Sequence, residues 1–409
     1  MNISKESIYG NDSNLGLFVS TVLLGGLAFG LYKGVQDNYL AEIVRITEFE
    51  RGIVEFFREL PGLLLIFILA AMYRFSETNV FKVGTAVMLV GVLGLLLSGS
   101  SKVMVILFMV VFSTGEHVVM PIKSSMSLAL ARKDKGGTSL GITSAIGKGG
   151  NILGYLVVSI IFLVFSRLGF SRRDTVAFKT VYALAAALLV GSTLVALAMK
   201  ESGRKVKRSR LYFRRKFLTF YLLEVFYGAR KQIFLTFAPY VLILVYGATT
   251  TTVSLLLALC SLFGMLLSPA IGRIIDRLGY KVVMVADTLI LVAVCLLYGF
   301  AHRLFPLHIA FCVVAVNFIL DSIISLASMA SNVYVMELSD DREELTATLT
   351  TGISVNHFIS VIIALLGGLI WKTVGIEVLF SVSAVLGVIN SIFAATITTP
   401  DNSSPQSRG

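Results

Sequence analysis

The sequence predicts an all-α integral membrane protein with about twelve transmembrane helices, both from its composition and from its apolar runs. Of 409 residues, 56% are hydrophobic and 14% are charged, and mean hydropathy is +0.86. A soluble domain is nearer a quarter charged. Apolar runs of about 18 residues or more recur from end to end, and each can cross the roughly 30 Å hydrocarbon core of a bilayer as one helix. The short alternating strands of a membrane β-barrel are absent from the sequence pattern.

Twelve such spans follow one another with short connections. They lie near residues 15–41, 51–72, 80–98, 103–130, 139–165, 178–199, 217–246, 251–270, 282–301, 307–336, 346–370 and 377–397. The longest polar stretch separates spans six and seven, so we expect an N-terminal six-helix half (1–199), a basic cytoplasmic linker (200–216) and a C-terminal six-helix half (217–409). The first apolar run is longer than the core of a signal peptide, so we expect it to be the first membrane helix.

The distribution of loop charges predicts that both termini are cytoplasmic. Loops on the same side of the membrane as the N-terminus contain more than twice as many Lys and Arg residues as loops on the other side. Arg51 is counted among the loop residues of that other side. The group Arg167, Arg172 and Arg173 runs against this bias. We expect a monomeric, multi-pass protein of the cell (inner or cytoplasmic) membrane. The net charge of +11 lies mostly in loops, which favours contact with the lipid bilayer over nucleic-acid binding.

Ionisable side chains inside the apolar runs carry the functional information. Each would cost about 2.5–3.5 kcal/mol at the bilayer centre, so the group is expected to face itself or a water-filled cavity. Its members are Lys33, Asp37, Glu55, Arg58, Glu59, Glu116, His117, Lys123, Lys148, Glu224, Arg230, Lys231, Asp321 and His357. Spans three, six and twelve carry none in their cores, and span nine carries only Asp287 near one end. Every third helix is therefore suited to face lipid, while the others surround a polar interior.

Helical spacing places several of these groups on shared faces, as with Glu116 and Lys123 in span four. Polar groups at one level on several helices are typical of a binding site. The predicted substrate-binding residues are Arg58, Lys123, Lys148, Tyr227, Arg230, Lys231, Asn356 and His357. The predicted ion-coupling residues are Glu55, Glu59, Glu116, Glu224 and Asp321. The alternative is that the charges form structural ion pairs between helices, above all Lys33 with Asp37.

A loop motif resembles that of a known family. Residues 272–281, between spans eight and nine, read Gly-Arg-Ile-Ile-Asp-Arg-Leu-Gly-Tyr-Lys. This stretch resembles the cytoplasmic loop signature Gly-x-x-x-Asp-Arg-x-Gly-x-Lys of the major facilitator superfamily. The resemblance implies two parallel six-helix repeats with a midplane site between them. It also implies a gating loop that latches one conformation, whose residues here are Gly272, Asp276, Arg277, Gly279 and Lys281.

The sequence departs from that family in three places. The matching loop after span two lacks the Gly-Asp-Arg-Gly frame. Span four has Gly115-Glu116-His117 where the family has an arginine motif, and span five has Gly147-Lys148-Gly149 in place of a glycine-proline signature. We therefore do not carry over a known proton relay.

The predicted function is secondary active transport of a small anionic or zwitterionic solute by alternating access, with a proton as the coupling ion. A carboxyl that takes up a proton leaves a cation free to bind the solute. Sodium coupling stays open, and the alternatives are an exporter of amphiphilic drug-like compounds and a non-transporting sensor or assembly protein. No catalytic motif or phosphate-binding Gly-rich loop indicates an enzyme or a nucleotide-driven pump. Cys260, Cys295 and Cys312 are expected to be buried small side chains, and we expect no cofactor and no metal site.

Overall fold

The computed structural model of the chain describes residues 8–10, 12–132, 135–201, 203, 205–206 and 211–397. Both chain ends and several positions of 200–216 lie outside these residues. The loop charges behind the predicted orientation are therefore only partly covered, and the cytoplasmic termini and the domain boundaries stay predictions.

The helices of the structure form twelve spans, six in each half. The first half contains α1 (Leu15–Asn38, continued by a π-helical turn Tyr39–Ile43), α2 (Glu48–Leu63) with α3 (Leu65–Ala71), α4 (Glu77–Ser98), α5 (Lys102–Leu130), α6 (Gly136–Arg167) and α7 (Thr175–Leu197). The second half contains α8 (Leu218–Leu244), α9 (Thr250–Leu278), α10 (Tyr280–Leu304), α11 (Leu307–Ile324) with α12 (Met329–Leu338), α13 (Arg342–Val374) and α14 (Ile376–Ala395). Spans two and ten are thus each broken into two helices.

Within the described residues, ten helices are long and apolar enough to cross a membrane. The two spans that do not meet this criterion are α2 with α3, and α8. Large apolar side chains such as Leu97, Val103 and Leu289 are each more than 70% exposed on the outside of the bundle. Apolar exposure on this scale suits a lipid-facing surface. The chain is a multi-pass helical membrane protein.

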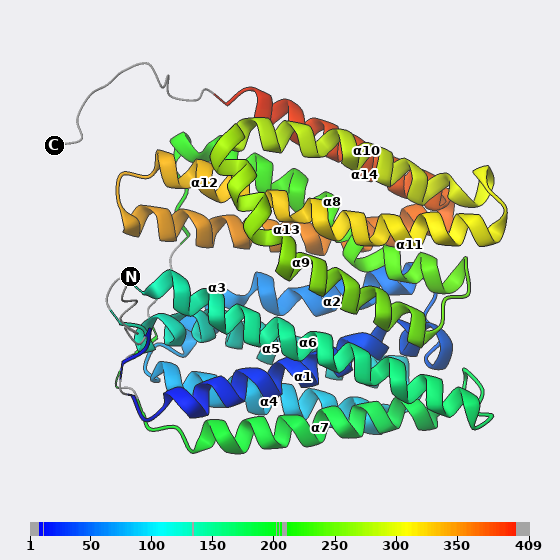
Figure 1. Cartoon of the computed structure of the whole chain (residues 1–409), viewed down its shortest axis with the longest axis horizontal. Helices are drawn as coiled ribbons and strands as arrows, with labels where there is room; N and C mark the ends of the chain where they lie inside the picture. Colours follow the sequence, from blue (N-terminus) through cyan, green and yellow to red (C-terminus); the bar gives the residue numbers. More distant parts are fainter. Residues whose placement is uncertain are drawn as a thin grey trace, which may run out of the picture.

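The halves lie side by side, and the plain helices lie at the periphery. In Figure 1, α4 and α7 form the lower edge and α10 and α14 the upper edge, while α2, α6, α9 and α13 lie in between. Across the middle, α2 packs against α13 and α6 packs against α9. These two pairings join spans two and eleven and spans five and eight, so each is the counterpart of the other under the pseudo-symmetry of the halves. The expectation that every third helix is peripheral is confirmed.

Glycines bring α1 and α6 into backbone contact. A Cβ built on Gly26 would lie 2.6 Å from the carbonyl oxygen of Gly147, and one on Gly154 would lie 2.5 Å from that of Leu27. Neither clash can be relieved by a side-chain rotation. Small residues of this kind let membrane helices approach closely.

The two halves are bonded to each other at the end opposite the 200–216 stretch. Tyr240 Oη donates to the carbonyl oxygen of Ile46 (2.8 Å), and Ser254 Oγ donates to that of Gly34 (2.8 Å). Asn38 Nδ2 also donates to the Ala248 oxygen at 3.1 Å. Among the described residues, hydrogen bonds between the halves reach only to mid-depth and are absent nearer the 200–216 end. The bundle is therefore closed at this end, which is the outer end in the predicted orientation.

An apolar cavity of about 260 Å³ separates the halves at the 200–216 end. Its lining comes from α2, α3, α13 and the end of the central stretch, and includes Leu63, Phe67, Phe213 and Phe358. The cavity lies on the side where the hydrogen bonds between the halves stop, and we call this side the open end.

Two expectations are wrong in detail. Arg51, which we counted among outer-loop cations, lies inside α2 and is 0% exposed. The helix begins three residues earlier than the predicted span, so Arg51 falls one turn inside it. Cys295 is buried and Cys260 half-buried as free thiols, but Cys312 is exposed on α11.

Candidate functional site

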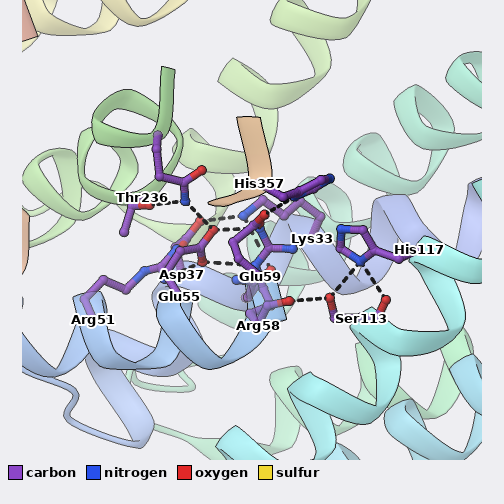
Figure 2. A network of polar contacts seen from close by, with 12 residues as sticks. Lys33, Asp37, Arg51, Glu55, Arg58, Glu59, Ser113, His117, Thr236 and His357 are labelled. Carbon is purple, nitrogen blue, oxygen red and sulfur yellow. Dashed lines mark hydrogen bonds and ion pairs between the residues drawn. The ribbon is translucent and has the colours of Figure 1, made fainter. Parts of the chain in front are cut away.

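A chain of buried charges runs along α1 and α2 at the closed end of the interface (Figure 2). Arg51 donates from Nη2 to Asp37 (3.0 Å) and from Nη1 to Glu55 (2.8 Å). Arg58 reaches Glu55 with Nη2 (2.6 Å) and Nε (3.0 Å), and it also contacts Glu59. Lys33 completes the group, with Nζ 3.3 Å from Asp37, so that expected ion pair is confirmed.

Local sequence explains why α2 presents these groups together. Thr47 and Glu50 form a capping box that starts the helix: Thr47 Oγ1 accepts from the Glu50 amide, and the Glu50 carboxylate accepts from the Thr47 amide. Residues three and four apart then lie on one face, which aligns Arg51, Glu55 and Arg58. Three cations and three carboxylates balance within the network, as buried charges require.

The ring of Tyr240 on α8 lies 5.7 Å from Cζ of Arg51, and two further side chains from the second half hydrogen-bond to carboxylates of this network. Gln232 on α8 donates from Nε2 to Glu55 (3.1 Å) and to Thr236 (2.9 Å). On α13, Nδ1 of His357 lies 2.9 Å from Oε2 of Glu59. Both contacts cross the interface at mid-depth, so the network forms the floor of the region where the halves separate.

A second polar cluster lies inside the second half. Arg230 pairs with Asp321 (2.8 Å), reaches Ser325 (3.4 Å) and lies over the ring of Tyr227, 5.2 Å from its centroid. One turn away, Glu224 accepts hydrogen bonds from Asn356 (3.2 Å) and Ser331 (3.4 Å). Beside Glu224 and Tyr227 is a cavity of about 20 Å³, room for about one water molecule.

Four of the predicted substrate-binding and ion-coupling residues have no bonded partner in the part of the chain that the structure describes. They are Glu116, Lys123, Lys148 and Lys231, all half-buried. Lys148 lies on the face of α6 that carries Ser159, three turns further on, and Ser159 Oγ donates to Thr251 across the interface (3.3 Å). Lys148 therefore points toward the second half at the depth where the halves are no longer bonded.

Glu116 is central among the groups of the first half. Its charge interacts with Arg58 on α2, with Lys123 two turns along α5, and with Tyr155 on α6. Lys231 on α8 interacts with Glu224 in the same way. The sequence placed Glu116, Lys148, Arg230, Lys231, Asp321 and His357 at one level. Of these, the structure brings only Arg230 and Asp321 into direct contact.

The predicted gating loop lies at the open end, but it is almost entirely helical. Gly272, Asp276 and Arg277 belong to the last two turns of α9, Lys281 belongs to the first turn of α10, and only Gly279 lies between the helices. The expectation of a loop at 272–281 is therefore wrong, because α9 continues through its polar last turns. Gly279 ends α9 at a positive φ of 80°, a conformation that favours glycine. Lys281 Nζ donates to the carbonyl oxygen of Ile397, 2.7 Å away, which ties this segment to the end of α14. Asp276 and Arg277 are exposed, and neither has a bonded partner among the described residues.

A separate group of ion pairs lies at this end of the second half. Lys216 Nζ lies 2.8 Å from Asp340 and 2.6 Å from Glu344. These hydrogen bonds, first to Asp340 and then to Glu344, raise the pKa of Lys216.

Three residues that contact the site, Arg51, Gln232 and His117, were not predicted as part of it. Arg51 lies four residues before Glu55, which indicates a shared helix face, but the predicted span began only at Arg51, so this residue was assigned to a loop. Gln232 is uncharged and carried no signal. His117 was noticed only as an ionisable group, although its ring lies 5.1 Å from that of His357, centroid to centroid.

Comparisons with known proteins agree with this architecture. The profile of the Major Facilitator Superfamily matches residues 17–339 and 220–409. A crystal structure of the nucleoside transporter NupG is similar with a TM-score of 0.70 and 15% identity, over 93% of this chain and 98% of that one. A D-xylose-proton symporter gives a TM-score of 0.72 and 15% identity, over 94% and 98%. A POT family transporter in complex with 5-aminolevulinic acid gives 0.71 and 12%, over 95% and 97%. No curated protein matches the sequence. Identities this low show the shared fold alone.

Proposed function

This chain belongs to the major facilitator superfamily, and we propose that it is a secondary active transporter for a small anionic or zwitterionic solute, working by alternating access with proton coupling. The proposal includes the cell membrane as its location, a monomer as its working form, and cytoplasmic termini. With that orientation, the state described above is closed to the outside and open to the cytoplasm.

The observation that carries the substrate class is the contrast between two sets of cations. Arg51, Arg58 and Arg230 are each held by carboxylates at 2.6–3.0 Å. Lys123 and Lys148 are half-buried with no hydrogen bond or ion pair in the described chain. A solute carboxylate or phosphate supplies the partner that such a desolvated ammonium lacks.

Proton coupling is supported by carboxyl groups that have no fixed cation. Glu116 has no bonded partner in the described chain, and Glu224 is held only by the neutral groups Asn356 and Ser331. Protonation of Glu116 or Glu224 would remove the negative charge that attracts the neighbouring lysine, Lys123 or Lys231 respectively. The lysine would then be free to bind the solute. The solute and the proton would then bind together. Among the structural neighbours, a D-xylose-proton symporter and a complex with 5-aminolevulinic acid, which carries an amine and a carboxylate, fit this scheme.

The test is ligand binding by thermal shift, with the purified protein and a panel of 5-aminolevulinic acid, dipeptides, dicarboxylates, nucleosides, D-xylose and organic cations. We expect stabilisation by a member that carries a carboxylate or phosphate. Lys148→Gln should weaken that binding by about 10–150-fold, because a hydrogen bond to a charged group contributes about 1.5–3 kcal/mol. Lys179→Gln, an exposed lysine on α7, is the matched control.

Unchanged affinity in the Lys148→Gln and Lys123→Gln variants, or a set of ligands that are all cations, would refute the substrate class. Counterflow of the bound ligand in proteoliposomes then separates a transporter from a sensor, since a sensor binds without flux.

An exporter of amphiphilic compounds is the second candidate. It is favoured by the apolar cavity of about 260 Å³ that Phe67, Phe213 and Phe358 help to line. Phe358→Ala should weaken ligand binding under this alternative and leave it unchanged under the first.

A further inference from the structure

Two histidines and a carboxylate from three different helices meet at the floor of the interface. Glu59 comes from α2, His117 from α5 and His357 from α13 (Figure 2). One ligand atom from each lies within 4.8 Å of the other two. Glu59 and His117 are buried, and His357 is half-buried beneath the open part of the interface. The transport scheme above gives His117 no role.

The hydrogen bond of His117 to its own helix determines which ring nitrogen is free. Its Nδ1 lies 2.8 Å from the carbonyl oxygen of Ser113, which can only accept. The proton of the neutral ring is therefore on Nδ1, and Nε2 keeps a lone pair. A backbone carbonyl behind Nδ1 is the usual arrangement behind a metal-binding imidazole, because it holds the tautomer and the ring plane.

The absence of a side chain at position 62 allows the two rings to approach. A Cβ built on Gly62 would lie 2.7 Å from Nε2 of His117 and 2.7 Å from Nδ1 of His357. Both nitrogens therefore lie over the same α carbon, on one side of the break between α2 and α3. Nδ1 of His357 is also 2.9 Å from Oε2 of Glu59, whose other oxygen contacts Arg58.

We infer that Glu59, His117 and His357 form a binding site for a divalent transition-metal ion of the Zn²⁺ type. Two imidazole nitrogens and one carboxylate oxygen are a ligand set that this class of ion prefers, with water at the fourth position. Ligand atoms about 2.1 Å from a tetrahedral ion lie about 3.4 Å apart. Closing the cluster from 4.8 Å takes a side-chain movement of about an ångström or more. The ion would also replace the proton that now lies between Nδ1 of His357 and Glu59, and that proton is released to solvent. This inference rests on geometry and is independent of the proposed solute.

The site joins the two halves. Glu59 and His117 belong to the first half and His357 to the second, so an ion held by all three adds a bond across the interface at mid-depth. Binding therefore stabilises the state that is closed at the outer end. A ligand that binds one conformation shifts the population toward it.

The test is titration of the purified full-length protein with Co²⁺, followed by its visible d–d absorption, with Zn²⁺ as competitor. We expect saturable binding of one ion per chain, and loss of affinity by about 100-fold or more in His117→Gln. Changing a group that hydrogen-bonds to a metal ligand lowers metal affinity by up to about 100-fold, and this variant removes a ligand itself. His308→Gln, an exposed histidine on α11, is the control that keeps binding. Mg²⁺ should not compete, since it prefers oxygen ligands.

A gain-of-signal variant separates lost binding from lost folding. His357→Cys keeps a ligand that suits this class of ion, and it should add a sulfur-to-cobalt charge-transfer band that the wild-type complex lacks. The inference is overturned if Co²⁺ does not bind saturably to the wild type, if His117→Gln binds as tightly as the wild type, or if His357→Cys gives no charge-transfer band while still binding Co²⁺.

Discussion

Gly52 is the position where a single added side chain should open the outer end. It lies on α2 where this helix crosses α13, and a Cβ there would contact the carbonyl oxygen of Ala364 and lie 3.2 Å from the α carbon of Gly368. Both contacts are with backbone, so Gly52→Val cannot be accommodated by a rotamer change. Overpacking of this kind costs about 1–3 kcal/mol. That cost falls only on the outer-closed state, so its population relative to an outer-open state should drop about 5–150-fold.

The assay is the distance between the outer ends of the halves, measured by spin labels at positions 179 and 308 in a background without the three native cysteines. Both positions are exposed, on α7 and α11 respectively. We expect a longer distance to appear or to gain population in Gly52→Val. Gly141→Val is the matched control, because a Cβ at Gly141 has no atom within 4 Å. An unchanged distance distribution in Gly52→Val would refute the assignment of this crossing as the outer closure.

Three further predictions follow from the charges. Arg51→Met leaves two buried carboxylates short of a cation and should lower the free energy of unfolding, measured with denaturant, by about 3–5 kcal/mol. The control Lys102→Met, at an exposed ion pair, should lower it by less than about 1 kcal/mol. Equal effects would contradict the burial of Arg51. Asp276→Asn should slow solute flux in proteoliposomes with nearly normal expression, and unchanged kinetics would remove the segment 272–281 from gating. Glu116→Gln should abolish the response of flux to an imposed pH gradient while counterflow persists, and a retained response would assign coupling to another carboxyl.

Hydropathy predicted the fold well because a membrane helix leaves a mark on the sequence that needs no tertiary information. Eleven of the twelve spans were located to within about four residues, whereas the eighth ended eight residues too early because α9 continues to Leu278. The peripheral helices were those with the fewest core charges. Errors of a few residues at helix ends still had consequences. With α2 starting at Glu48 in place of residue 51, Arg51 changes from a loop cation into the centre of a buried network.

The site could be predicted only as far as local spacing reaches. Glu55, Arg58 and Glu59 lie three and four residues apart, so the sequence shows that they can meet. His117 and His357 are 240 positions apart on different halves, and no spacing rule connects them. Arg230 and Asp321 were both recognised as intramembrane charges, yet their pairing depends on how α8 packs beside α11. Sequence therefore identified the polar groups, and tertiary packing decided which of them are neutralised and which stay free.

The ion pairs and the hydrogen bonds are divided between the halves in a way that suits alternating access. Among the described residues, every ion pair between a carboxylate and Lys or Arg in the membrane interior lies within one half: the α1–α2 network in the first, and Arg230 with Asp321 in the second. In the membrane interior, the hydrogen bonds across the interface come from uncharged donors such as Gln232 and Tyr240, and His357 contacts Glu59. At the closed end, Arg172 donates to the carbonyl oxygen of Gly247.

That division sets the cost of opening the outer end. Separating the halves breaks hydrogen bonds that contribute about 0.5–1.5 kcal/mol each and that water can replace. Opening a buried ion pair would instead cost about 3–5 kcal/mol for each charge left without a partner. Because none of these interior ion pairs spans the interface, the halves can part at a cost of a few hydrogen bonds. Any added bond across the interface, as from an ion held by Glu59, His117 and His357, would then be large enough to decide which state is populated.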